Sequence, residues 1–298
     1  MPSQQDIIAS FVIITLGLLG VIVNGYVIYA MVKTRPFGYA FGLICVSHTV
    51  ANLGLTGVSA LLVGPITLFA PWIHDTYWGH RVGQILVMFW NGAVFSHFLI
   101  AVNRFVCLTW PMKYDTIFRK QVINMAIAMI WTLALMQTIP YFYEGCIFEF
   151  TFVGYTYKFV ENTCGFYIGT VFDYYTSITV VSTIAFIDFC TFMKIRNHQK
   201  LVANVPTFGS NRNPKKDKKF FFQACTQGCA FLGELICFFS ISEVVGDNTW
   251  LKFGFTTVSW ILVHTLDGRS HSPQTLALLS TLYLCTLYRQ KRNHSLEP

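Results

Sequence analysis

Residues 97–114 read HFLIAVNRFVCLTWPMKY, an apolar run that meets Asn103-Arg104 near its end and stops at Trp110-Pro111. A chain that keeps charge out of such a run has placed an arginine at its edge. Any basic residue could anchor a helix end there, because a long side chain can reach from the membrane boundary to water. The rest of the sequence must therefore decide what Arg104 does.

The composition indicates a protein that crosses a membrane several times. Of 298 residues, 54% are hydrophobic and only 12% are charged, about half the charged fraction of a soluble domain. Several apolar runs exceed the roughly 20 residues that a helix needs to cross a bilayer. They lack the ten-residue alternation of a membrane β-barrel, so helices are expected. The basic residues lie between the apolar runs, which argues against a nucleic-acid partner.

Seven apolar runs each predict a membrane-spanning helix, so the expected fold class is an all-α bundle of seven helices. The runs are residues 7–32, 39–69, 82–106, 122–142, 166–193, 220–245 and 250–266. The seventh is the shortest and carries Lys252 near its start. One domain, residues 1–268, is expected to hold all seven.

The basic residues also predict the orientation of the bundle. If the N-terminus lies outside, all but three of the 21 lysines and arginines fall on the inner side. The exceptions are Arg81, Lys158 and Lys252. Because inner loops of membrane proteins are enriched in Lys and Arg, the N-terminus is expected outside and the C-terminus in the cytoplasm.

Five stretches occur in order along the chain: GVIVNGYVIYAMV, IAVNRFVCLTWPMKYDTIF, the pair Cys146 and Cys164, FIDFCTFMKIR, and FGFTTVSWILVHTLDG. In this order the chain resembles a G-protein-coupled receptor, and more closely the nematode chemoreceptors called serpentine receptor class X. The resemblance covers about residues 17–268. It implies a rhodopsin-like fold, a small-molecule ligand, a heterotrimeric G protein as partner, and the cell membrane of a sensory cell as location.

The resemblance also implies a cytoplasmic switch at the inner end of the third span. Asn103 stands where rhodopsin-like receptors commonly carry an acid, so their acid–arginine lock is missing, and Asp188 is expected to join the signalling face or to pair with a nearby base. A simple membrane anchor remains the alternative for Arg104. The candidate switch residues are Asn103, Arg104, Phe105, Asp188, Lys194 and Arg196. The basic loop 194–219 is expected to face anionic membrane lipid, the G protein, or both.

Acidic residues inside membrane spans cost free energy to bury, and they therefore indicate functional sites. Asp173 lies about two turns below the outer end of the fifth span, where ligand contact and structural hydrogen bonding are both open. Glu234, Asn24 and Asn52 are interpreted as structural polar residues, with Ser47 or Asn52 as the expected partner of Asn24. The candidate ligand residues are Trp90, Asn91, Tyr167, Asp173, Thr256 and Trp260.

Cys146 and Cys164 bracket a polar stretch on the predicted oxidising side. A disulfide between them would close a surface loop and order the entrance to the bundle. The link of rhodopsin-like receptors, from this loop to the top of the third helix, cannot form because no cysteine lies between Cys45 and Cys107. The other seven cysteines are expected to be reduced packing residues.

Other functions are less well supported. An intramembrane hydrolase would need zinc ligands, but His48, His97 and His264 offer no two histidines on one helix face, so no metal, cofactor or enzymatic activity is expected. A transporter or ligand-gated channel is the stronger alternative, although no internal repeat is visible. After Gly268 the sequence departs from the family pattern. Residues 275–288 are expected to form an interfacial helix of an atypical tail, 269–298, or to reflect an altered exon boundary.

Overall fold

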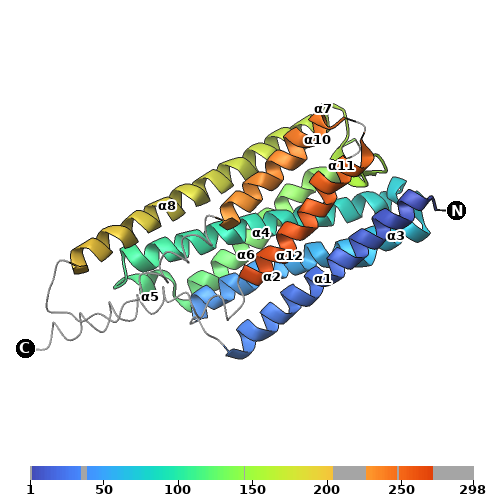
Figure 1. Ribbon diagram of the computed structural model, residues 1–298. Coiled ribbons are helices and arrows are strands. Elements are labelled where there is room, and N and C mark those ends of the chain that lie inside the picture. The colour runs from blue at the N-terminus through green and yellow to red at the C-terminus, as the bar shows by residue number, and fades with distance from the viewer. Residues whose placement is uncertain (1, 35–38, 144, 204–225, 247, 271–298) are drawn as a thin grey trace, which may run out of the picture.

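The structure of the chain is a computed structural model that describes residues 2–34, 39–143, 145–203, 226–246 and 248–270. Figure 1 shows its long helices aligned in one bundle, with the N-terminus, α3, α7, α10 and α11 at one end and the short helix α5 at the other. The first of these ends is called the outer one below, following the orientation that the basic residues predict. The proposed tail helix at 275–288 lies outside the described residues.

The first four spans follow the expected order. They are α1 (Gln4–Thr34); α2 (Tyr39–Val58) with the π-helix η1 (Ser59–Val63) and α3 (Gly64–Phe69); α4 (Tyr77–Thr109); and α6 (Lys120–Thr138) with the 3-10 helix η3 (Ile139–Phe142). A 3-10 helix, η2 (Pro71–Asp75), and the short α5 (Tyr114–Ile117) connect them.

The last three spans are each interrupted by a π-helix. The fifth comprises α7 (Thr163–Phe166), η4 (Tyr167–Tyr175) and α8 (Thr176–Ala203). The sixth comprises helical residues 226–236, η5 (Cys237–Ile241) and α10 (Ser242–Val244). The seventh comprises α11 (Thr249–Phe253), η6 (Gly254–Val258) and α12 (Ser259–Ser270).

The expectation of a seven-helix membrane bundle is therefore confirmed. Six of the described helices are long and apolar enough to cross a membrane. The seventh run, Thr249–Ser270, is longer than the sequence suggested and extends for about 30 Å at 1.5 Å per residue, along α1 and α2. Lys252 and Asp267 lower its apolar character, but Asp267 is buried inside the bundle.

Side-chain caps define where several outer segments begin. Thr76 accepts a hydrogen bond from the Gly79 amide at the start of α4, and Asn248 does the same for Leu251 at the start of α11. Such caps satisfy amide groups that have no partner within their own helix. The outer ends of these spans are thereby fixed at polar residues.

A β-hairpin covers the outer end of the bundle. Strands β1 (Phe148–Thr151) and β2 (Thr156–Phe159) pair antiparallel, with Phe148 opposite Phe159. Phe148, Phe150 and Tyr157 are buried in an outer core with residues of α1 and α4. This hairpin was not predicted, since the stretch was interpreted only as a polar loop. Its aromatic residues alternate with polar ones, the pattern of a strand with one buried face.

Candidate functional site

A small cavity lies between the outer halves of the third, fifth, sixth and seventh spans, beneath strand β1. In this conformation it has room for about two water molecules and is partly open. Its walls are mainly aromatic and aliphatic, with two carboxyl groups among them. The lining residues are Val87, Trp90, Phe148, Asp173, Glu234, Leu235, Phe238, Phe239 and Trp260.

The π-helices bring several of these side chains to the cavity. Asp173 lies within η4, and Phe238 and Phe239 lie within η5. Trp260 is the second residue after the end of η6 at Val258. A π-helix shifts the register of the side chains that follow it, and such segments are frequent at functional sites. The cavity is therefore built where three of its four helices depart from regular α-helical geometry.

Both carboxyl groups of the cavity have an oxygen without a partner. Oδ1 of Asp173 and Oε2 of Glu234 are buried and make no hydrogen bond. Trp90, in contrast, is fixed: its Nε1 donates to Ser177 Oγ at 3.2 Å. The cavity thus combines a held indole ring with two carboxyl groups whose hydrogen-bonding capacity is not used up by the protein.

Half of the predicted ligand residues line the cavity and half do not. Trp90, Asp173 and Trp260 are in its wall. Asn91 is buried and donates to the carbonyl of Val87, and Thr256 donates to that of Lys252. Tyr167 is 55% exposed. Glu234, which was interpreted as a structural polar residue, lies in the cavity wall instead.

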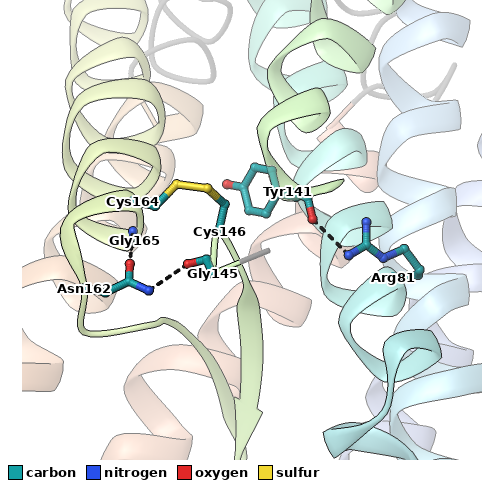
Figure 2. The surroundings of a disulfide bond; sticks show 7 residues. All are labelled: Arg81, Tyr141, Gly145, Cys146, Asn162, Cys164 and Gly165. Atoms are coloured by element: carbon teal, nitrogen blue, oxygen red, sulfur yellow. Dashed lines mark hydrogen bonds between the residues drawn. A yellow bond between two sulfur atoms is a disulfide. The ribbon is translucent and has the colours of Figure 1, made fainter. Parts of the chain in front are cut away.

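The disulfide between Cys146 and Cys164 joins the segment before β1 to α7 at the start of the fifth span (Figure 2). Asn162 Nδ2 donates to the Gly145 carbonyl, and its Oδ1 accepts from the Gly165 amide, so the side chain ties together the two ends that the disulfide joins. On the neighbouring span, Arg81 Nη2 donates to the Tyr141 carbonyl at 2.9 Å. The disulfide places Phe148, two residues after Cys146, in the cavity wall.

The expectation that the other seven cysteines are reduced is wrong for Cys107, at the inner end of the third span, which is disulfide-bonded. Cys45, Cys190, Cys229 and Cys237 are free. Cys225 and Cys285 lie outside the described residues.

The hairpin is also tied to the first and seventh spans. The Tyr155 hydroxyl donates to Asp6 Oδ1, and Thr257 Oγ1 donates to the Tyr155 carbonyl, both at 2.7 Å. Opposite charges pair across the strands, with 3.5 Å between Lys158 Nζ and Glu149 Oε1. The cover of the cavity is thus held from several sides.

A buried polar cluster lies next to the cavity on its inner side. Asp267 accepts hydrogen bonds from Asn52 Nδ2 at 2.9 Å and from Gln227 Nε2, and it pairs with His48 Nε2. His264 Nδ1 lies 2.7 Å from Asn52 Oδ1. The cluster therefore joins the second, sixth and seventh spans through side chains that are nearly free of solvent contact.

Asn24 does not bind the residues that we expected. Its Nδ2 donates to the carbonyls of Gly20 and His264, so it connects the first span to the seventh. Ser47 accepts from Trp131 Nε1 and lies 3.4 Å from Ser96 Oγ. The spacing of Asn24 in an apolar run indicated that it needed partners, but it could not show which helix supplied them.

At the inner end of the bundle, Arg104 faces Asp188 of the fifth span. Arg104 Nη2 lies 3.3 Å from Asp188 Oδ1, and both side chains are buried. Asn103 contacts the Tyr114 hydroxyl, which is 3.1 Å from its Nδ2 and 3.3 Å from its Oδ1. Burial raises the pKa of Tyr114. The hydroxyl therefore keeps its proton and holds α5 against the third span.

The remaining switch candidates lie at the surface of the same end. Lys194 and Arg196 are exposed, and Lys194 Nζ lies 5.7 Å from the ring centroid of Phe105. The rest of the basic loop, residues 204–219, lies outside the described residues, so its expected role at the lipid surface stays a prediction.

The chain matches the family described as "Serpentine type 7TM GPCR chemoreceptor Srx" over residues 14–269. It belongs to the Srx chemoreceptor family. It is 23% identical to "Serpentine receptor class X 45" of Caenorhabditis elegans over 279 residues, which cover 88% of this chain and 77% of that protein. It is 28% identical to the human "Melatonin receptor type 1B" over 61% of this chain and 49% of that receptor.

The fold of this Srx receptor is that of a rhodopsin. Squid rhodopsin superposes with a TM-score of 0.64 at 15% sequence identity, covering 96% of this chain and 88% of that one. Family and fold together make the chain a multi-pass membrane protein of the G-protein-coupled receptor class. Among the described residues of this Srx chain, no group of histidine, cysteine and acidic side chains could hold a metal ion.

Proposed function

We propose that this chain is a chemosensory receptor that binds a small molecule in the outer cavity and signals to a heterotrimeric G protein at the inner end of the third span. The cell membrane of a sensory cell is its proposed location. The observation that carries the proposal is the arrangement of a partly open aromatic cavity at one end of the bundle and a buried Arg104–Asp188 pair at the other. Membership of a chemoreceptor family supports it.

A continuous set of contacts supports coupling between the cavity and the polar cluster. The ring centroid of Phe231 lies 5.7 Å from that of Trp90 in the cavity wall. The same ring lies 5.4 Å from His97 and 5.8 Å from His264. Phe231 and the cavity residue Leu235 are one turn apart on the sixth span. A ligand that displaces the outer part of the sixth span would therefore change the packing around His264 and its neighbours.

The inner end offers the groups that a G protein could meet. In the resting arrangement proposed here, Asp188 holds Arg104 between the third and fifth spans. A conformation that separates these two spans would free the guanidinium for a partner. Ligand binding shifts such an equilibrium only to the extent that the ligand binds one conformation more tightly than the other.

The test is second-messenger output from cells that express the full chain, challenged with a broad panel of odorants and small metabolites. Arg104→Ala should abolish the response while the protein still reaches the cell surface. Arg119→Ala is the matched control, because Arg119 is an exposed arginine on the same side of the membrane. A response that survives Arg104→Ala unchanged would contradict the switch role. Ligand-gated current in cells without G proteins would favour a channel.

A further inference from the structure

The cavity carries two acidic groups to which the described part of the chain supplies no counter-charge. Neither Asp173 nor Glu234 takes part in an ion pair among the described residues. Among the residues that line the cavity, these two are the only charged ones. Glu234 is only 6% exposed, and its Oε2 has no hydrogen-bond partner. Carboxyl groups in such surroundings are costly unless a cation or a proton compensates them.

The walls of the same cavity favour an ammonium ion over a metal cation. Five of the nine lining residues are aromatic: Trp90, Phe148, Phe238, Phe239 and Trp260. The faces of aromatic rings attract ammonium groups, and tryptophan does so best. Calcium and magnesium instead require six or more oxygen ligands, whereas this wall has oxygen-bearing side chains only at Asp173 and Glu234. With a neutral ligand, protonation would be the only means left to compensate the two carboxyl groups.

We infer that the cavity binds a small organic ammonium ion, whose head group lies between Asp173 and Glu234 and whose apolar part packs against Trp90 and Trp260. The inference rests on the proposed function, because it names the ligand class of the same cavity. The present space has the size of an ammonium head group rather than of a whole ligand. Phe238 and Phe239 of η5 line this space and must move to admit the apolar substituent.

The position of Glu234 links this binding to the coupling route. Glu234 lies one residue from Leu235 and one turn after Phe231 on the sixth span, and Asp173 lies on the fifth. An ammonium ion attracted to both would draw the fifth and sixth spans together at their outer ends. Charge on the ligand, and not only its shape, would then favour one conformation of the bundle.

The test uses the purified full chain in lipid nanodiscs, with thermal unfolding as the readout. The probes are two matched pairs, hexylamine against hexanol and phenethylamine against 2-phenylethanol. Because a ligand that binds only the folded state stabilises it, an amine should raise the unfolding midpoint at concentrations where its alcohol does not. Hexanoate, with the opposite charge, should have no effect.

Charge-neutralising variants locate the binding. Asp173→Asn and Glu234→Gln should each weaken the amine effect by about thirtyfold or more, as expected when one member of a buried charge pair is removed. Asp75→Asn and Glu243→Gln are the matched controls, because both residues are exposed and lie outside the cavity. These controls should bind the amines as the native chain does.

Three outcomes would overturn the inference. They are alcohols that stabilise as well as the amines, amine binding that survives both cavity substitutions, and the absence of any amine effect at millimolar concentrations. None of these outcomes decides the proposed function. If the cellular assay still responds to a neutral odorant, the receptor role stands and only the ligand class is wrong.

Discussion

Arg104 and Asp188 form a buried ion pair between the third and fifth spans, with 3.3 Å between Nη2 and Oδ1. The residue next to Arg104 in the sequence is Asn103, which contacts Tyr114 instead. The guanidinium is thus held by a residue of another helix and not by the adjacent residue in the sequence. Separation of the third and fifth spans at their inner ends would break this pair, whereas a lock within one helix would not depend on that distance.

Asp188→Asn is expected to raise basal second-messenger output. Loss of one partner leaves the other charge buried, at a cost of about 3–5 kcal/mol, so conformations that expose Arg104 to water become more populated. The measurement is ligand-free signalling, normalised to the amount of receptor at the cell surface. Asp188→Glu keeps the charge and serves as the control. Unchanged basal output and unchanged thermal stability in Asp188→Asn would contradict the restraint.

Much of the fold follows from the sequence because hydrophobic length and charge placement act locally. Six of the seven predicted runs exceed the roughly 20 residues that a helix needs to cross a bilayer, and the basic residues orient them, so the bundle could be predicted without any tertiary contact. The boundaries were less certain because caps such as Thr76 extend α4 outward to Tyr77, five residues before the expected start at Val82. The π-helices were not predicted, since no residue type marks a change in backbone register.

The site was predicted less completely because its residues meet only through packing. Trp90, Asp173 and Trp260 were chosen for their depth along each span, but depth does not specify which face of a helix points inward. Tyr167, near the outer end of the fifth span, is exposed and lines no part of the cavity. Phe148 could have been suspected from the alternation of aromatic and polar residues at 148–151 and 156–159. Nothing in the spacing of residues along the sequence indicated that Asp267 contacts both His48 and Asn52.

Loss of the disulfide is expected to destabilise the outer end. Cys146 and Cys164 are 18 residues apart, a loop whose closure is worth about 3 kcal/mol. Cys146→Ser should lower the thermal unfolding midpoint and reduce the response to any ligand, because Phe148 loses its fixed place in the cavity wall. The double variant Cys146→Ser/Cys164→Ser should resemble the single one.

Cys229→Ser is the control for this prediction, because Cys229 is free and exposed. A mild reductant should lower the unfolding midpoint of the native chain at least as much as Cys146→Ser does, because it also reduces the disulfide of Cys107. Equal unfolding midpoints in Cys146→Ser and the native chain would show that the hairpin is held by its other contacts alone.

Gly83→Ala is expected to push the hairpin away from the third span. A Cβ atom at Gly83 would lie 2.7 Å from the carbonyl oxygen of Phe148 and 2.9 Å from the ring of Tyr157. The carbonyl belongs to the backbone of β1 and cannot rotate away, so the strand must shift, at a cost of about 1–3 kcal/mol. Thermal unfolding and ligand response should both decline.

Gly42→Ala offers a control of the same chemical change within a helix. Among the described residues, a Cβ atom there meets no atom within 4 Å beyond its own stretch of helix, and alanine favours the helix over glycine by about 0.5–1 kcal/mol. This variant should be as stable as the native chain or slightly more stable. If Gly83→Ala behaved like Gly42→Ala, the close approach between the third span and β1 would not matter for stability.

The outer cap should become less stable under mildly acidic conditions because of His74. The side chain lies in η2, stacked on Phe150 with 3.9 Å between ring centroids. Thr67 Oγ1 donates to the Val63 carbonyl and therefore accepts from His74 Nε2, at 2.9 Å. This leaves Nδ1 as the site for a second proton, in a buried position without a hydrogen-bond partner.

Burial lowers the pKa of His74 from 6.5 to about 4. The unfolded chain therefore binds a proton below pH 6.5 that the folded chain refuses until about pH 4. The contribution of the neutral imidazole to the free energy of unfolding is complete above pH 6.5. It is lost as the pH falls toward 4, and at pH 5 the loss is about 2 kcal/mol. Thermal unfolding between pH 7.5 and 4.5 should show a steeper decline for the native chain than for His74→Gln, whose side chain takes up no proton. Parallel pH profiles for the two proteins would mean that His74 is protonated without cost and that the acid sensitivity arises from other groups.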